Sequence, residues 1–160
     1  MGRHGQRSRS NGRVLLVGSS GGHLAQLVAL RAWWESLERV WVTFDTPDAR
    51  SQLRDENVRY AYFPTTRSLR NLLRNAWLSV RVLRTDRPDV IVSTGAGVAL
   101  PFFVLGRLLG IKTVYVEVYD RIDSATLTGR LCRPFTELML VQWPEQLGLY
   151  RRARLIGPLL

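Results

Sequence analysis

Apolar residues in this chain fall in short runs that alternate with amphipathic stretches. Short runs rich in β-branched residues, each stopped by glycine, proline or polar residues, are typical of buried strands. Stretches whose apolar residues recur every three or four positions are typical of helices. Because the two kinds of segment alternate, we predict an α/β fold with a Rossmann-like parallel sheet flanked by helices. The predicted strands cover residues 13–17, 39–44, 58–63, 89–93, 112–117 and 137–142, with a small one at 154–156.

The predicted helices lie between these strands, at residues 23–38, 49–56, 68–84, 98–109, 126–135 and 144–152. The clearest is 68–84, whose apolar residues follow the spacing of a buried stripe. The stripe consists of Leu69, Leu72, Leu73, Ala76, Trp77, Val80 and Leu83.

Arginines gather beside that stripe. At about 100° per residue, five of them fall within roughly 100° of one another, with Trp77 at the boundary. An arginine face bordered by tryptophan is typical of an interfacial helix on anionic lipid, and a solvated charged face is the alternative. The helix containing Phe102 and Phe103 is apolar nearly all round, so it either packs inside the protein, which we favour, or partly enters a membrane. The five arginines are Arg67, Arg70, Arg74, Arg81 and Arg84.

The first strand ends at Gly18, and Gly21-Gly22-His23 opens the next helix. The first N–H groups of a helix have no partner within it, and glycines allow an anion to approach them closely. The spacing matches neither G-x-G-x-x-G nor a P-loop, so a plain strand-to-helix turn is the alternative. His23 is a candidate base beside that turn, or else a capping or packing residue.

A second glycine turn, Thr94-Gly95-Ala96-Gly97, follows the fourth strand. Open α/β sheets bind ligands at the carboxyl ends of their strands, so the two turns are expected to face one crevice. Glu117 and Arg121 follow the fifth strand and suit a site there, unless they only pair with each other. Asp45 ends the second strand, and without a dinucleotide fingerprint we interpret it as a turn residue.

The composition of the chain shows a strong excess of positive charge. The chain has 160 residues, and 23 Lys and Arg against 13 Asp and Glu give a formal charge of +10. Such a balance favours nucleic acid, an anionic membrane surface or a phosphorylated substrate, although arginine richness is also a genomic composition bias. Cys132 is the only cysteine, which excludes an internal disulfide and a C-x-x-C metal site and suits a reducing cytoplasm.

The chain is long enough for one domain with a core, which we place at residues 13–160. Residues 1–12 lack an apolar segment, so we predict a flexible basic tail and no signal peptide. No stretch reaches the roughly 20 apolar residues of a membrane-spanning helix.

Several of these segments occur in the order found in one group of proteins. The chain resembles the membrane-associated, acceptor-side subunit of two-component UDP-sugar glycosyltransferases, which includes the eukaryotic dolichol-pathway N-acetylglucosaminyltransferase accessory subunit and bacterial exopolysaccharide proteins of the PssD type. It is also similar to the N-terminal half of MurG-like enzymes of the GT-B fold. The segments are 17–23, 88–97, Glu117 with Arg121, 126–129, 141–143 and 156–160.

The resemblance implies half an enzyme. The chain is expected to bind a polyprenyl-diphosphate-linked sugar, with His23 as the first candidate base and Glu117 as the second, while a separate subunit binds the UDP-sugar. No cofactor or metal is implied. The subunit is expected in the cytoplasm, at the inner face of the cytoplasmic membrane, although the eukaryotic members have an N-terminal membrane helix that this sequence lacks.

The same resemblance assigns the remaining site residues. The acceptor diphosphate is expected to contact Ser19, Ser20, Gly21, Gly22, Thr94, Gly95, Ala96, Gly97 and Arg121. Membrane contacts are expected at Arg70, Arg74, Trp77, Arg81, Phe102 and Phe103. The apolar end of the chain predicts contacts with the partner subunit at Ile156, Gly157, Pro158, Leu159 and Leu160.

Two other functions are compatible with parts of the sequence. The charge allows a basic nucleic-acid-binding module, but no helix-turn-helix, zinc-finger or RNP pattern is visible, so no nucleic acid is expected. The α/β pattern allows a nucleotide-binding Rossmann domain of an oxidoreductase, which the missing G-x-G-x-x-G pattern disfavours.

Overall fold

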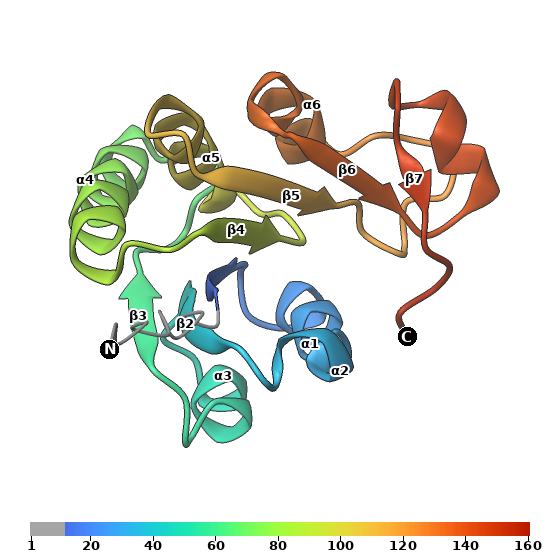
Figure 1. Cartoon of the computed structure of the whole chain (residues 1–160). Coiled ribbons are helices and arrows are strands. Elements are labelled where there is room, and N and C mark those ends of the chain that lie inside the picture. The colour runs from blue at the N-terminus through green and yellow to red at the C-terminus, as the bar shows by residue number, and fades with distance from the viewer. Residues whose placement is uncertain (1–11) are drawn as a thin grey trace, which may run out of the picture.

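The computed structural model describes residues 12–160, so nearly all of the predicted basic tail lies outside the described residues. A parallel sheet of seven strands runs through the domain in the order β3-β2-β1-β4-β5-β6-β7 (Figure 1). The predicted α/β fold is confirmed, and each predicted strand is present within a few residues. The strands are β1 (Arg13–Val17), β2 (Glu38–Phe44), β3 (Val58–Ala61), β4 (Val90–Ser93), β5 (Lys112–Val116), β6 (Leu138–Val141) and β7 (Arg154–Leu155).

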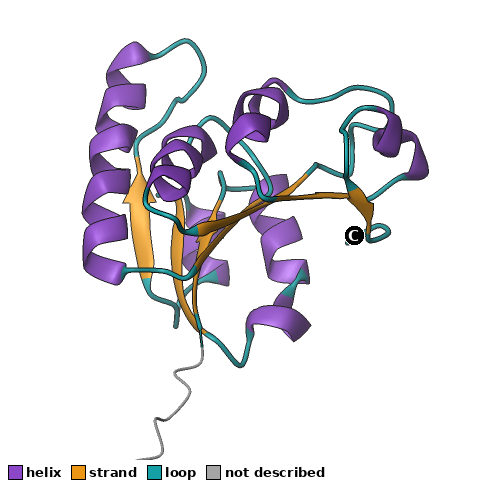
Figure 2. Ribbon diagram, turned by 45° about the horizontal axis from the view of Figure 1, so that its top comes forward, coloured by secondary structure: helices purple, strands orange, loops and turns teal. Residues whose placement is uncertain are grey.

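Helices cover both faces of this sheet (Figure 2). Helices α4, α5 and α6 lie on one face, and α1, α2 and α3 lie on the other (Figure 1). The predicted helix 23–38 is interrupted at Leu30, where ψ is 12°. The helices are α1 (Gly22–Ala29), α2 (Arg31–Trp34), α3 (Pro47–Gln52), α4 (Leu69–Asp86), α5 (Ala99–Leu108) and α6 (Leu127–Cys132), with 3₁₀ turns η1 (Arg133–Phe135) and η2 (Pro144–Gly148).

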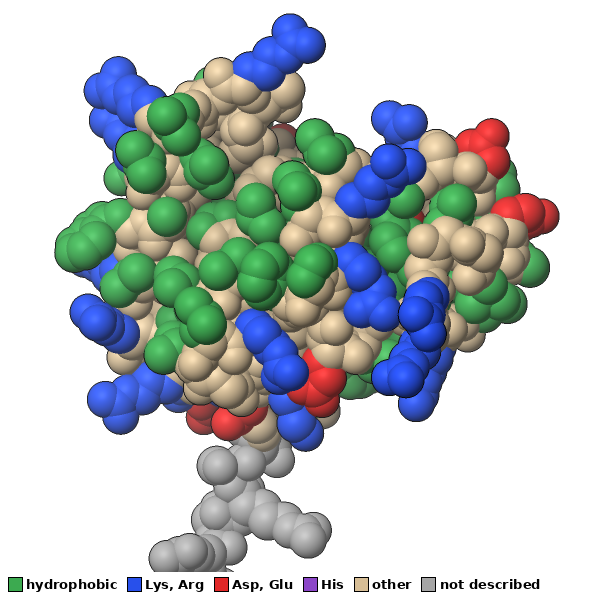
Figure 3. Space-filling model, turned by 90° about the horizontal axis from the view of Figure 1, so that it is seen from above, with side chains coloured by type: hydrophobic (Ala, Val, Ile, Leu, Met, Phe, Trp, Pro, Cys, Tyr) green, Lys and Arg blue, Asp and Glu red, His purple; other side chains and the backbone are tan. Residues whose placement is uncertain are grey.

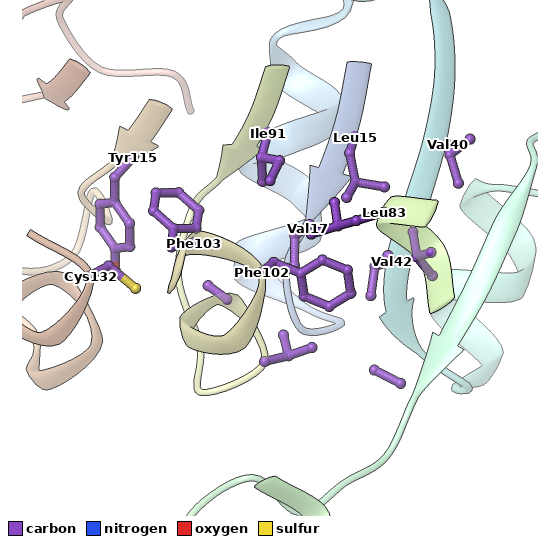
Figure 4. Close-up of a cluster of buried hydrophobic side chains, with 14 of the residues drawn as sticks. Leu15, Val17, Val40, Val42, Leu83, Ile91, Phe102, Phe103, Tyr115 and Cys132 are labelled. Carbon is purple, nitrogen blue, oxygen red and sulfur yellow. The ribbon is translucent and has the colours of Figure 1, made fainter. Parts of the chain in front are cut away.

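Alternating side chains of the strands build one core on each face, because successive strand residues point to opposite sides. On the α4–α6 face, Phe102 and Phe103 of α5 are completely buried against the strands (Figure 4). The ring of Phe103 packs edge-on against Tyr115, with centroids 5.8 Å apart. The predicted membrane contact of these two phenylalanines is therefore wrong, because neither ring reaches the surface.

Helix α4 turns a different face inward from the one that its apolar pattern predicts. Leu69, Leu73 and Trp77 are 70%, 63% and 72% exposed. Of the predicted stripe, Leu83 near the end of the helix is buried as expected. The apolar stripe of α4 is thus largely a surface feature.

Polar residues occupy the buried side of α4. Asn75 donates to the carbonyl of Tyr62 at 2.9 Å and accepts from its N–H at 2.9 Å. Asn71 donates to the carbonyl of Pro64 at 2.9 Å. These amides satisfy the backbone of the β3–α4 connection, which has no sheet partner at this point.

Strands β1 and β4 are neighbours at the centre of the sheet, although the chain visits β2 and β3 between them. This is the topological switch point, where ligands of open α/β sheets bind beyond the carboxyl ends of the strands. Both glycine turns leave the sheet at this place.

Candidate functional site

Two reciprocal hydrogen bonds join the glycine turns. The Nδ1 atom of His23 lies 2.8 Å from the carbonyl oxygen of Thr94, and the Thr94 hydroxyl donates to the carbonyl of His23 at 2.8 Å. The turn after β1 and the turn after β4 are therefore in direct contact. The predicted proximity of the two turns is confirmed, and a crevice that both turns face stays a prediction.

The contact with Thr94 determines which nitrogen of His23 carries the proton. A carbonyl oxygen only accepts, so Nδ1 must be the donor in this hydrogen bond. In the neutral ring, Nε2 then has a free lone pair. The side chain is partly exposed. His23 is consequently held in the tautomer that a general base requires.

Glycine is required at one position in each turn. Gly21 has φ 69° and ψ −134°, a conformation open essentially to glycine alone. Gly95 has φ 113°, and a Cβ there would lie 2.7 Å from the Tyr115 hydroxyl and 3.2 Å from Cε1 of His23. The absence of a side chain at Gly95 leaves room for the imidazole.

Some of the turn amides are already occupied. The N–H of Gly21 donates to Asp48 Oδ2 at 3.0 Å, and the N–H of Gly95 donates to the Ser93 hydroxyl at 2.9 Å. Asp48 also places a carboxylate beside the first turn, which disfavours an anion there. The structure therefore corrects the diphosphate contacts predicted for the Gly21 and Gly95 amides.

The second turn offers the better anion site. Gly97 precedes α5, a ten-residue helix whose dipole favours a negative charge at this end. The N–H of Ala99 already donates to the carbonyl of Ala96 at 3.0 Å, and Pro101 has no N–H, so the dipole is the main contribution. Ala96 has φ 66°, a left-handed conformation that is uncommon outside glycine. Ser19, Ser20 and Gly22 belong to the first turn, where the Ser19 hydroxyl donates to the carbonyl of Ser20 at 3.3 Å.

Glu117 lies in a buried cluster and not in an open site. Its side chain is fully buried and accepts from the N–H of Val118 at 3.0 Å and the hydroxyl of Thr126 at 3.0 Å. The Tyr150 hydroxyl donates to it as well. A carboxylate enclosed in this way does not reach an acceptor hydroxyl, so its predicted role as a base is not supported.

Burial and this carboxylate together affect neighbouring groups. Burial raises the pKa of Tyr115 and of Tyr150, and the negative charge of Glu117 raises both further. For the same two reasons, the pKa of Cys132 is raised to about 12. Gly129 lies so close that a Cβ there would be 2.6 Å from Glu117 Oε2. The cluster is a structural junction of β5, α6 and the segment around Tyr150.

Two other predicted residues lie at the surface. Arg121 is exposed, and its carbonyl accepts from the Gln146 side chain at 2.8 Å. It forms no ion pair with the buried Glu117, so the pairing considered from the sequence is wrong. Asp45 pairs with Arg50, with 2.8 Å between Nη2 and Oδ2, which confirms it as a turn residue.

A chain of buried glutamines, which the sequence pattern does not predict, lies behind the first turn. Gln26 of α1 donates to the carbonyl of Gly22 at 3.2 Å and accepts from Gln142 at 2.6 Å. Gln142 in turn accepts from the N–H of Leu159 at 2.8 Å. The link therefore runs from the start of α1 to the end of the chain. The sequence signal for this chain of glutamines is their place at otherwise apolar positions of a helix and next to a strand.

An apolar surface lies between α4 and α5. It forms a groove of about 530 Å³ lined by the exposed side of α4 and by α5. Looking down on this face, Figure 3 shows hydrophobic side chains gathered together with Lys and Arg side chains around them. Arg70, Arg74 and Arg81 are exposed, and Arg74 also lies over the Tyr62 ring at 5.0 Å. We name this groove and its rim the α4/α5 patch, lined by Leu72, Leu73, Ala76, Trp77, Val80, Leu100, Pro101, Val104 and Leu105.

The end of the chain lies beside a further apolar groove on the opposite face of the sheet. Ile156 and Leu159 line this groove, whose volume is about 300 Å³, together with strand residues of β4, β5 and β6. Leu160 is 58% exposed, and Pro158 is exposed too, while Gly157 turns the chain with φ 80°. Leu30 and Trp33, from the end of α1 and from α2, also line the groove, so the predicted partner segment borders an apolar groove between these helices and the sheet.

Two absences within residues 12–160 bear on the site. Within these residues, no helix is both long and apolar enough to span a membrane. In the same part of the chain, no group of three or more His, Cys, Asp or Glu side chains lies close enough together to hold a metal ion.

Comparison with solved structures places the fold. Acinetobacter baumannii MurG superposes with a TM-score of 0.69 and 18% identity, over 84% of this chain and 42% of MurG. UDP-GlcNAc 2-epimerase from Methanocaldococcus jannaschii superposes with a TM-score of 0.61 and 14% identity, over 81% of this chain and 39% of the epimerase. The expected likeness to MurG-type GT-B enzymes is confirmed for the fold.

Comparison of sequences gives the family. The human UDP-N-acetylglucosamine transferase subunit ALG14 is 24% identical over 175 residues, covering 90% of this chain and 81% of the human protein. The Schizosaccharomyces pombe subunit is 43% identical over 75 residues, which cover 44% of this chain and only 36% of the yeast protein. Residues 54–159 match the family described as "Oligosaccharide biosynthesis protein Alg14 like". Because that match spans more than half of the chain, the protein belongs to the Alg14-like family.

Proposed function

We propose that this chain is the acceptor-binding subunit of a glycosyltransferase that moves N-acetylglucosamine from its UDP derivative to a polyprenyl-diphosphate-linked saccharide. The product would serve lipid-linked oligosaccharide or exopolysaccharide synthesis. Family membership and the names of its relatives support the reaction class. The single observation that carries the acceptor role is the position of His23, held by Thr94 between the two glycine turns.

In this mechanism, Nε2 of His23 takes the proton of the acceptor hydroxyl as its oxygen attacks the anomeric carbon of the donor sugar. The bond between that carbon and the UDP oxygen breaks, and UDP leaves with the bonding electrons. The Nδ1–H contact with Thr94 keeps the ring oriented while Nε2 becomes protonated. The second glycine turn, at the start of α5, holds the acceptor diphosphate.

The sugar donor is bound by a second subunit in this proposal. The relatives are named subunits, and the apolar groove beside Ile156 and Leu159 is a suitable docking surface. We expect the purified chain alone to transfer no sugar, because the proposal assigns the donor site to the second subunit.

Transfer is expected when the chain is co-purified with its donor-binding subunit and supplied with UDP-N-acetylglucosamine and a polyprenyl-diphosphate sugar. Product is measured by thin-layer chromatography of the radiolabelled lipid. The same pair with Ile156→Asp is the matched test of docking, since this exposed side chain supports no buried core. Transfer by the isolated chain would contradict the two-subunit proposal.

We further propose that the α4/α5 patch rests on the inner face of the cytoplasmic membrane. Its leucines and Trp77 would enter the interface, while Arg70, Arg74 and Arg81 would meet anionic headgroups. This orientation brings the second glycine turn, at the start of α5, toward the lipid.

The membrane proposal predicts that the double variant Leu73→Glu, Trp77→Glu loses at least ten-fold in its partition onto vesicles containing phosphatidylglycerol. Both side chains are mostly exposed, so the fold should persist. Sedimentation with vesicles measures the effect. The double variant Leu147→Glu, Leu149→Glu, on η2 and just beyond it, adds the same charge and should bind like the unmodified chain. Equal loss in both variants would show a general charge effect instead.

A further inference from the structure

A large groove adjoins the second glycine turn, and most of its lining residues have no part in the roles described above. Its volume is about 780 Å³, and it lies between the β3–α4 connection, the start of α5 and helix α6. We name it the α4/α6 groove. It is lined by Thr65, Thr66, Arg67, Ser68, Leu69, Leu72, Gly97, Leu100, Leu127, Thr128 and Leu131.

The groove is polar along the β3–α4 connection, where it meets the glycine turn. Hydroxyl groups come from that connection and from Thr128, and Arg67 adds a guanidinium. Among residues 12–160, the ion pairs of the structure leave Arg67 out. Gly97 lies tightly against Thr65, because a Cβ at Gly97 would be 2.9 Å from Cβ of Thr65. An unpaired cation with hydroxyl donors is suited to phosphate oxygens.

The remainder of the groove is apolar and continues into the α4/α5 patch. Leu72 and Leu100 line both the groove and the patch. Leu127 and Leu131 form the opposite wall, and they are 72% and 47% exposed. A ligand that follows this path has a phosphate at one end and a hydrocarbon chain that leads toward the surface proposed to face the membrane.

We propose that the α4/α6 groove binds the diphosphate and the first isoprene units of the polyprenyl acceptor. The inference rests on the proposed function and specifies which part of the substrate this surface binds. An isoprenoid diphosphate fits better than a phospholipid, because the polar end of the groove leads to the turn that contacts His23. A substrate must extend to His23 in order to react, whereas a membrane phospholipid has no need to reach it.

The test is calorimetric titration of the full-length chain with farnesyl diphosphate, a short isoprenoid diphosphate. Farnesol and inorganic diphosphate are titrated separately as ligands that lack one half of it. Farnesyl diphosphate is expected to bind at least ten-fold more tightly than either. Arg67→Gln removes the charge, and Leu131→Glu places a carboxylate on the apolar wall, so each should weaken binding about ten-fold.

The chain offers matched controls for both variants. Arg152 is another arginine with positive φ, 62° against 54° for Arg67, so Arg152→Gln makes the same change at a comparable backbone position. Leu147 is 42% exposed against 47% for Leu131, and it lies outside the groove. Arg152→Gln and Leu147→Glu should change the affinity less than two-fold.

Several results would overturn this assignment. One such result is that farnesyl diphosphate binds no more tightly than farnesol. Another is that the two groove variants bind farnesyl diphosphate as tightly as the unmodified chain does. An equal loss of binding to phosphatidylglycerol vesicles in those variants would assign the groove to bulk lipid. If the assembled pair transfers sugar and the groove variants transfer it at the same rate, only this inference is contradicted and the proposed function stands. Farnesyl diphosphate binding in the groove without any transfer by the pair would remove the proposed function and leave the groove assignment standing.

Discussion

Replacing His23 with asparagine is expected to lower the rate of sugar transfer by the assembled pair by about 10² to 10⁴-fold. The asparagine amide can still donate to the carbonyl of Thr94, as Nδ1 does over 2.8 Å in the unmodified chain. It cannot take up a proton at neutral pH. The variant therefore separates proton transfer from the positioning of the turn, and single-turnover measurements at saturating substrate report on it.

The control for this variant is Thr94→Val, which removes the hydroxyl that donates to the carbonyl of His23 but keeps the carbonyl that orients the ring. We expect a smaller loss, of about ten-fold, because one neutral hydrogen bond between the turns is removed. Binding of farnesyl diphosphate should persist in His23→Asn. A His23→Asn pair that keeps its transfer rate would exclude this histidine as the base.

Replacing Glu117 with leucine is expected to destabilise the fold by about 3 to 5 kcal/mol. The substitution leaves the N–H of Val118 and the hydroxyls of Thr126 and Tyr150 without their acceptor inside the protein. Buried donors without partners cost much more than the hydrogen bonds contribute when formed. Urea unfolding followed by circular dichroism measures the change, and a lower midpoint with an unchanged slope indicates lost stability.

The matched control for Glu117 is Glu137→Leu, since Glu137 is an exposed carboxylate just before β6. Its effect should stay within about 0.5 kcal/mol. A Glu117→Leu chain of unchanged stability that no longer supports transfer would reverse our reading and restore this carboxylate as a candidate base.

The sequence predicts the sheet well because strand signals in this fold are local. The central strands β1, β2 and β4 are buried on both faces, so the apolar run of each and the glycine or proline after it appear within a few residues. The position of the two glycine turns follows from the same logic, since parallel strands place their carboxyl ends at one edge. The contact between His23 and Thr94, 71 residues apart, is the product of that topology.

The environments of individual side chains are less predictable. Periodicity identifies the apolar stripe of α4, but it does not show whether that stripe meets the sheet or an external partner. The buried face instead carries Asn71 and Asn75, whose partners lie in the preceding connection. The place of Glu117 after a strand predicts a site residue. In the structure it is enclosed by hydrogen-bond donors from Thr126 and Tyr150. Such partners are fixed only by tertiary packing.

The inward amides of α4 have a practical consequence for handling this protein. Because Asn71 and Asn75 anchor the helix, the outward leucines contribute little to folding, and they can be exchanged for polar residues. A redesigned surface of this kind should yield a monodisperse, detergent-free sample. Crystallisation of the subunit would then become practical while both glycine turns remain intact.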